Sequence, residues 1–255
     1  MNVEEAYLEL KLKNARESFS DKLLLQLATD EVIEIRCEVA SNLNTPRYIL
    51  ERLSIDENEE VRSGIATNPN THYMTLNNLA HDDHYYVRRS LAWFENTHSA
   101  LLRILSHDKD IEVRCGVASN NNSNSETLIK ALEDEEWKVR AALTQNQNIS
   151  NQIRKQLSED KNYEVRILMA ENEASDSKIL TNLSKDSNKD VRVSVASNPS
   201  SSQDTLDNLS KDGHFDVRYA VATNLKTPIK TLNQLFYDKD RIIIEAAENH
   251  PKILK

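Results

Sequence analysis

Asp and Arg recur along the chain at a fixed separation and a fixed period. An Asp stands six residues before each Arg, and the pair returns after 26 residues without an insertion or deletion. These two side chains can bind each other through charge-assisted hydrogen bonds, or the Arg can bind phosphate. The pairs are Asp30 and Arg36, Asp56 and Arg62, Asp82 and Arg88, Asp108 and Arg114, Asp134 and Arg140, Asp160 and Arg166, Asp186 and Arg192, and Asp212 and Arg218.

The position of the Arg on its predicted helix favours the structural interpretation of these pairs. At 100° per residue, the Arg shares one side of the helix with the Val before it and the Val three residues after it. A partly buried Arg needs a carboxylate, so we expect the Asp six residues earlier to pair with it, in its own or the adjacent repeat. A row of arginines that binds phosphates would need them unpaired. The sequence therefore predicts a structural ladder.

The third repeat carries the strongest candidate for a binding surface. It reads HYYVRRSLAWFEN, and Tyr86, Arg89 and Trp93 occupy all three positions predicted to point away from the core, while Phe94 replaces the usual Asn. Tyr, Trp and Arg are enriched at the energetic centres of protein interfaces. Aromatic residues also recur three positions before the repeat Arg, where they either bind a partner or pack over the neighbouring helix. The full candidate partner-binding set is Tyr85, Tyr86, Arg89, Trp93, Trp137, Tyr163, Phe215 and Tyr219.

Acidic residues form a third periodic set, two positions before the repeat Arg. This row could bind a partner, but acids in the first turn of a helix also complement the helix dipole, and we favour that explanation. The set comprises Glu34, Glu60, Glu112, Glu164, Asp190 and Asp216.

Histidines beside acids raise the hypothesis of a metal site. His81 and His84 flank Asp82 and Asp83, but Asp82 belongs to the ladder, and the chain has neither HExxH nor paired Cys-x-x-Cys motifs. The three Gly, at 64, 116 and 213, cannot form a Gly-rich phosphate loop. The sequence therefore indicates no metal, no cofactor, no catalytic residue and no enzymatic activity.

Each repeat predicts two short helices that position these residues. The first ends at an Asn such as Asn68, because Asn tolerates the left-handed conformation that terminates helices. The second begins at Thr45-Pro46 or Thr227-Pro228, with a Thr cap before a Pro at the first helical position, and carries Leu at a spacing of three. Helices of about 9–12 residues are unstable alone in water, so the repeats must be stabilised by stacking.

The two ends of the chain depart from the repeat. Residues 1–20 fit it only in part, and Val3 to Leu12 predicts an amphipathic helix that covers the open end of the first repeat. Near the other end, Ile244, Glu248 and His250 replace Arg, Ala and Asn. Terminal repeats of an array must differ because their outer faces meet water. We expect one continuous domain with an N-terminal capping helix at 1–20, repeats at 21–242 and a C-terminal cap at 243–255.

The units VRSGIATNPNTHYMTLNNLAHD and VRVSVASNPSSSQDTLDNLSKD resemble the leucine-rich repeat variant family, a bacterial α-solenoid, over about residues 21–242. The resemblance implies an all-α fold, a right-handed superhelix of about nine 26-residue two-helix repeats. The Asp and Arg spacing is similar to that of HEAT repeats. Some family members hold an iron–sulfur cluster in a cysteine-rich N-terminal segment, which this chain lacks before Cys37. The resemblance implies no reaction.

Composition narrows the classes of partner. The net charge of −9 disfavours nucleic acid, which requires concentrated Lys and Arg. Cys37 and Cys115 lie three repeats apart, several times the reach of a disulfide, so we expect free thiols and a reducing, cytoplasmic location. No apolar run is long enough to span a membrane.

These observations favour a non-enzymatic protein–protein interaction scaffold. We expect a monomer, an adaptor, inhibitor or immunity-type protein, that binds a protein partner on one face and does not associate with membranes. The first alternative is a DNA mimic that uses the acidic face, or a HEAT-like nucleic-acid-binding protein. The last is a DNA glycosylase-type enzyme that uses Trp93, Trp137 and the abundant Asp.

Overall fold

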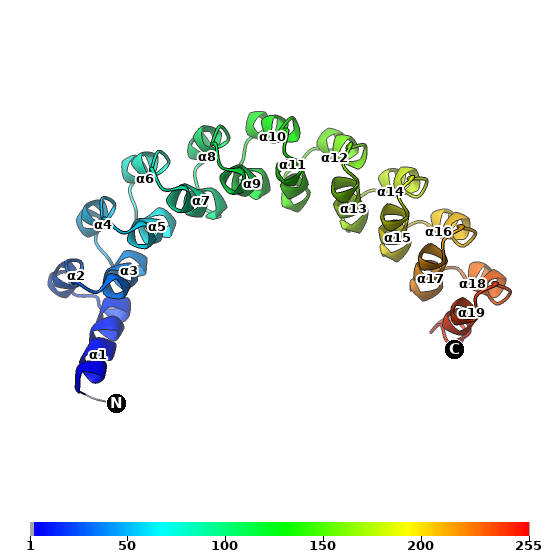
Figure 1. Cartoon of the computed structure of the whole chain (residues 1–255), viewed down its shortest axis with the longest axis horizontal. Coiled ribbons are helices and arrows are strands. Elements are labelled where there is room, and N and C mark those ends of the chain that lie inside the picture. The colour runs from blue at the N-terminus through cyan, green and yellow to red at the C-terminus, as the bar shows by residue number, and fades with distance from the viewer. Residues whose placement is uncertain (1–2, 255) are drawn as a thin grey trace. The chain divides into compact units, whose positions relative to one another are not determined.

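The computed structural model describes residues 3–254, and its regular structure is entirely helical (Figure 1). These residues form nineteen α-helices and one 3₁₀ helix, with no strand in the described range. After α1 (Val3–Glu17), two helices alternate in every repeat. The predicted all-α array of two-helix repeats is therefore confirmed.

The chain divides into two compact units, Met1–Asn146 and Gln147–Lys255. In each unit, successive first helices of the repeats pack side by side, and the second helices cover one side of that row (Figure 1). The first helices of the first unit are α3 (Ile33–Ser41), α5 (Glu59–Thr67), α7 (Tyr85–Trp93), α9 (Ile111–Ser119) and α11 (Trp137–Ala142), which the 3₁₀ helix Leu143–Gln145 extends. Those of the second unit are α13 (Tyr163–Glu171), α15 (Lys189–Ser197), α17 (Phe215–Thr223) and α19 (Arg241–Glu248).

The second helices are shorter than the sequence predicts, with seven or eight residues each. In the first unit they are α2 (Asp21–Leu27), α4 (Arg47–Leu53), α6 (Tyr73–Leu79), α8 (Ser99–Leu105) and α10 (Ser125–Leu132). In the second unit they are α12 (Asn151–Ser158), α14 (Ser177–Leu183), α16 (Gln203–Leu209) and α18 (Ile229–Leu235).

Side-chain caps and apolar burial explain why these segments are helical. The Asn58 side chain accepts hydrogen bonds from the backbone N–H groups of Glu60 and Val61 and so begins α5. Val61 and Ile65 of that helix are completely buried. Helices of seven to nine residues gain most of their stability from such packing, because they are too short to persist alone.

The Asn that ends each first helix does not adopt the left-handed conformation that the sequence predicts. Asn68 has φ −81° and ψ 120°, and no non-Gly residue of the described chain has a positive φ. Its Nδ2 instead donates to two carbonyl oxygens of the preceding repeat, Ala40 O at 2.8 Å and Asn42 O at 3.1 Å. We call this series the asparagine ladder, and its members are Asn42, Asn68, Asn120, Asn146, Asn198 and Asn224.

The Thr residues before α4 and α18 also differ from their predicted role as caps. Pro46 itself is the N-cap residue of α4, and the buried Thr45 hydroxyl donates to the carbonyl of Val39 at 2.6 Å. Thr227 makes the same bond to Val221. These hydroxyls tie the two helices of one repeat together by satisfying a carbonyl at the end of the first helix.

The two ends of the array are built differently from the interior repeats. In α1, residues 3–10 are exposed, and only the second half of the helix contacts the array, through buried Ala15 and an ion pair from Lys11 to Asp30 at 2.6 Å. At the other end, His250 is buried, and its Nε2 lies 3.2 Å from the carbonyl oxygen of Asn224. His250 therefore takes over the contact that Asn makes in the asparagine ladder.

Candidate partner-binding surface

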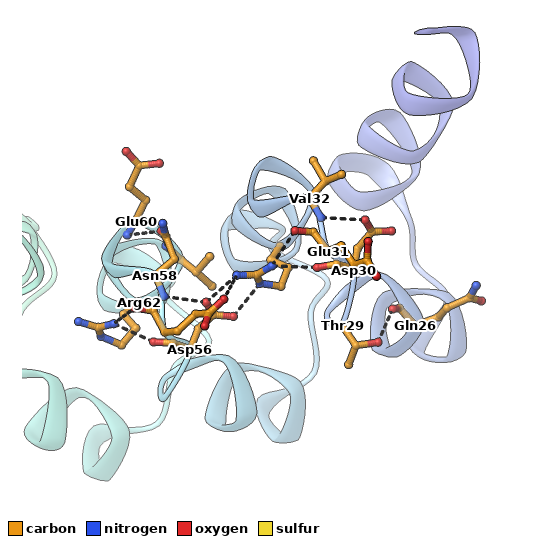
Figure 2. Close-up of polar contacts among 12 residues, drawn as sticks. Gln26, Thr29, Asp30, Glu31, Val32, Asp56, Asn58, Glu60 and Arg62 are labelled. Carbon is orange, nitrogen blue, oxygen red and sulfur yellow. Dashed lines mark hydrogen bonds and ion pairs between the residues drawn. The ribbon is translucent and has the colours of Figure 1, made fainter. Parts of the chain in front are cut away.

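The repeat Arg contacts two successive repeats at once, and Figure 2 shows the contact of Arg62 with the Asp56 backbone in its own repeat. Arg62 donates from Nε and Nη2 to both carboxylate oxygens of Asp82 in the next repeat, at 2.7 and 2.9 Å. Its Nη1 donates to the backbone carbonyl of Asp56, at 2.7 Å. The partner carboxylate is thus 20 residues after the Arg, in the adjacent repeat, whereas the Asp six residues earlier contributes its carbonyl.

The same bidentate pair recurs in both units. The first contains Arg36 with Asp56, Arg62 with Asp82, Arg88 with Asp108, and Arg114 with Asp134, and the second contains Arg166 with Asp186, Arg192 with Asp212, and Arg218 with Asp238. Arg140 and Asp160 hold the corresponding positions between these two groups of pairs. Arg140 donates to the backbone carbonyls of Asp134 and Glu135, and the Asp160 carboxylate accepts from the backbone N–H of Asn162. We call this series the Arg–Asp ladder.

Burial and hydrogen bonding act in opposite directions on the ladder carboxylates. Burial alone would raise the pKa of Asp82, but the hydrogen bonds from Arg62 and from the backbone N–H of His84 outweigh it and lower that pKa. These hydrogen bonds hold the Asp82 carboxylate ionised and occupy the Arg62 guanidinium. Neither side of this ladder is free to bind a phosphate or a substrate.

The third repeat presents its predicted group on one exposed side of α7. Tyr86, Arg89 and Trp93, here called the α7 cluster, lie at successive turns of this helix, and Tyr85 begins it. The exposed fractions of Trp93 and Tyr86 are 43% and 37%, so both rings remain accessible to a partner.

Trp93 is exposed but held in place by the next repeat. Its Nε1 donates to the carbonyl oxygen of Glu112 in α9, at 3.2 Å. The ring covers Gly116, where a Cβ atom would come within 2.6 Å of the indole Cδ1. Packing and a hydrogen bond therefore fix one face of the indole and leave the other accessible. The role of Gly116 was not predicted from the sequence. A Gly inside a predicted helix, one repeat after Trp93, was the feature that could have indicated it.

Arg89 retains unused hydrogen-bonding capacity. Its Nε lies 3.8 Å from a carboxylate oxygen of Glu112, beyond hydrogen-bond distance, and this buried nitrogen has no hydrogen-bond partner within the described chain. Unlike Arg88, which is buried and bound to Asp108, the Arg89 side chain as a whole is 39% exposed.

A pocket of about 570 Å³ lies beside the α7 cluster. It is lined by Thr67, Arg89, Ser90, Trp93, Phe94 and Glu95. Phe94 occupies the position that Asn holds in the asparagine ladder. Its side chain has no amide group, so it cannot donate to the corresponding carbonyl oxygens of the preceding repeat, those of Ala66 and Asn68. The pocket is thus located where the asparagine ladder is interrupted.

The remaining predicted aromatics do not form a single cluster. Trp137 is half-buried at the start of α11, two repeats after α7. In the second unit, Phe215 and Tyr219 stack on α17 with ring centroids 5.8 Å apart. Tyr163 is exposed at the start of α13, where a hydrogen bond to Glu164 raises the pKa of its hydroxyl.

Three of the histidines make structural contacts. The side chains of His72 and His98 accept backbone N–H bonds at the starts of α6 and α8, and His81 lies 2.9 Å from the carbonyl of Asn77. Between residues 3 and 254, no three or more His, Cys, Asp or Glu are grouped as metal ligands. In the same range, no helix has the length and apolar character needed to cross a bilayer.

Both cysteines are free thiols. Burial is the main cause that raises the pKa of each thiol to about 11. The negative charge of a nearby carboxylate adds to this effect, from Glu60 for Cys37 and from Glu112 for Cys115. They therefore remain protonated near neutral pH and are poor nucleophiles.

Comparisons with known proteins identify the fold. No family profile and no curated protein sequence matches the chain. A solved structure titled as a leucine-rich repeat variant with a novel repetitive structural motif is similar, with a TM-score of 0.67, 23% identity, and coverage of 87% of this chain and 88% of that one. An engineered protein is similar at a TM-score of 0.38 and 14% identity, with 96% and 92% of the two chains covered, too low a score to contribute to the assignment. The arrangement of paired helices in this chain is therefore the fold of a leucine-rich repeat variant.

Proposed function

We propose that the chain is a non-enzymatic protein–protein interaction scaffold and that a partner protein binds on the exposed side of α7. The observation that carries the proposal is the state of Trp93, which is 43% exposed yet fixed by Glu112 and Gly116. Large aromatic side chains contribute much of the free energy of protein interfaces. A side chain that is already ordered loses less conformational entropy on binding than a mobile one.

The surroundings of Trp93 support the same proposal. Arg89 offers a partly exposed cationic side chain, Tyr86 offers a second exposed ring, and the adjacent pocket can accept a side chain of the partner. The supporting helices are held together, since Ser63 of α5 and Ser90 of α7 share a hydrogen bond of 2.7 Å. Trp137 extends the proposed partner-binding set within the first unit, and Tyr163, Phe215 and Tyr219 are a separate part of that set in the second unit.

Replacing the centre of the surface tests the function. In the double variant Trp93→Ala with Arg89→Ala, we expect capture of the native partner to fall at least tenfold while Tm changes by less than a few degrees. The readout is quantitative affinity purification from the native host followed by mass spectrometry, with Tm from circular dichroism.

The matched control is Tyr48→Ala with Arg52→Ala, which removes an exposed aromatic residue and an Arg from the second helix α4. It should retain the partner. Equal losses in both variants, or a large fall in Tm for the α7 variant, would contradict the proposal, because the α7 residues would then act through folding.

A further inference from the structure

We infer that the segment bound at α7 is an extended, basic segment of the partner protein. Its Lys or Arg side chains pair with Glu60 and Glu112 and lie against Tyr86 and Trp93. This inference rests on the proposed function and specifies the chemistry of its partner.

The carboxylates that flank the α7 cluster have almost no cations of their own. Glu60 on α5 and Glu112 on α9 occupy the same repeat position as Tyr86, on the helices that pack on either side of α7. Both are exposed. No Lys or Arg of residues 3–254 forms an ion pair with Glu60. Within the same residues, the one ion pair of Glu112 is with Arg89, whose Nε lies 3.8 Å from a Glu112 carboxylate oxygen.

The helix dipole accounts for acids at these positions but not for their lack of partners. A first-turn carboxylate gains up to about 1 kcal/mol from the dipole, and it can still bind a cation. Glu95 adds a third exposed carboxylate at the rim of the pocket. Glu60, Glu112 and Glu95 outnumber Arg89 beside the α7 cluster, so the cluster's surroundings attract a basic segment and repel an acidic one.

The aromatic rings suit the same partner. A Lys or Arg cation over the face of Tyr or Trp gains about 0.5–1 kcal/mol at an exposed site. The aliphatic stems of these side chains can bury themselves in a partly apolar pocket while their charged ends reach the carboxylates.

The spacing of the flanking carboxylates sets the length of the segment. Packed helices are about 8–10 Å apart, so the distance across two such intervals, from α5 to α9, is about 16–20 Å. An extended chain rises about 3.3 Å per residue, so two cations five or six residues apart would match these carboxylates. Six residues of helix would span only about 9 Å.

Synthetic peptides test this chemistry directly. The probe is a fluorescein-labelled ten-residue peptide of Gly and Ser with Arg at positions 2 and 7, and the comparison peptides carry Glu at these positions or Arg at positions 4 and 5. By fluorescence anisotropy, we expect the 2,7-Arg peptide to bind at least tenfold tighter than the Glu peptide and several-fold tighter than the 4,5-Arg peptide. Added salt should weaken its binding.

Variants of the full chain separate local recognition from general charge attraction. The double variant Glu60→Gln with Glu112→Gln should bind the 2,7-Arg peptide at least fivefold more weakly than the unmodified chain does. The control, Glu51→Gln with Glu126→Gln, removes the same charge from exposed positions on α4 and α10 and should have little effect. Equal weakening by the two double variants, or preference for the Glu peptide, would overturn the inference.

Failure of this inference is distinguishable from failure of the proposed function. If none of the peptides binds but capture of the native partner still requires Trp93 and Arg89, the partner is not a basic segment and the scaffold function stands. If none of the peptides binds and capture of the native partner is also unchanged when Trp93 and Arg89 are replaced, both proposals are wrong.

Discussion

The side chains of α7 illustrate how neighbouring residues acquire different roles. Arg88 is buried and bound to Asp108, whereas Arg89 is partly exposed and lies 3.8 Å from a carboxylate oxygen of Glu112. Trp93 is partly exposed but rests on a helix of the next repeat. The difference follows from position on the helix, since residues one turn apart share a face while adjacent residues are separated by 100°.

Gly116 offers a test of how Trp93 is held. We expect Gly116→Ala to displace the indole, because the new Cβ would lie within 2.6 Å of Trp93 Cδ1. The ring is partly exposed and can move outward, so Trp fluorescence should shift to longer wavelength, with a stability change of about 1 kcal/mol. Partner binding should weaken with it.

Gly64→Ala is the matched control, because Gly64 has the same repeat position but its Cβ would meet Ala40 at 3.0 Å and no Trp. This variant should leave the fluorescence spectrum unchanged. An unchanged spectrum in Gly116→Ala as well would mean that the indole is not seated on Gly116 in solution.

At the scale of elements, each first helix is joined to the next by two sets of polar contacts. Arg side chains bind Asp carboxylates of the following repeat, and Asn amides bind carbonyls of the preceding one. Both sets satisfy polar groups at helix ends or in partly buried positions, where an unpaired group is costly. Aliphatic contacts supply the adhesion between helices, and the ladders fix which residues face each other.

Removing one member of the Arg–Asp ladder should destabilise the array. In Arg88→Ala, the Asp108 carboxylate, whose side chain is 7% exposed, loses both of its Arg hydrogen bonds. Leaving a buried charge unpaired costs about 3 kcal/mol. Urea unfolding should show this loss, while Arg89→Ala, one residue away, should change the free energy of unfolding by less than about 0.5 kcal/mol. Similar values for the two variants would mean that the ladder contributes little.

For the molecule as a whole, the ladder carboxylates link stability to pH. In six of them, burial would raise the pKa, but hydrogen bonds from the paired Arg and the backbone lower it below its ordinary value: Asp56, Asp82, Asp108, Asp186, Asp212 and Asp238. Asp30, which Lys11 binds, has a lowered pKa for the same reasons. Because the folded pKa is the lower one, the unfolded chain takes up these protons first as the pH falls.

The contribution of the ladder is therefore complete above the unfolded pKa of about 4 and decreases as the pH falls through the lower folded values. We expect Tm to be nearly constant from pH 7 to pH 5 and to fall steeply below pH 4, as measured by circular dichroism. Salt at 0.5 M should not restore the lost Tm, since partly buried pairs are screened less than surface charges. A flat profile down to pH 3, or full recovery in salt, would argue against the ladder as the cause.

The sequence by itself determined the class of fold and the residues that repeat. The 26-residue period, the buried Val and Leu positions, and the Asp and Arg pairs were all readable because each recurs several times. The α7 cluster was also readable, since Tyr86, Arg89 and Trp93 interrupt a pattern that the other repeats keep. A single globular domain would have offered no such internal comparison.

Only the tertiary structure decided how the repeats contact one another. Each repeat Arg has an Asp six residues before it and another 20 residues after it. These two Asp are one 26-residue period apart and hold the same repeat position, so the sequence could not tell which carboxylate the Arg binds. The structure assigns the carboxylate to the next repeat and the carbonyl to the Arg's own repeat. The seating of Trp93 on Gly116 and the carbonyl contacts of Asn68 likewise depend on side chains that meet across a helix interface. Periodicity specifies which faces are buried, whereas the partner of each side chain is fixed only when two packed helices bring particular atoms within reach.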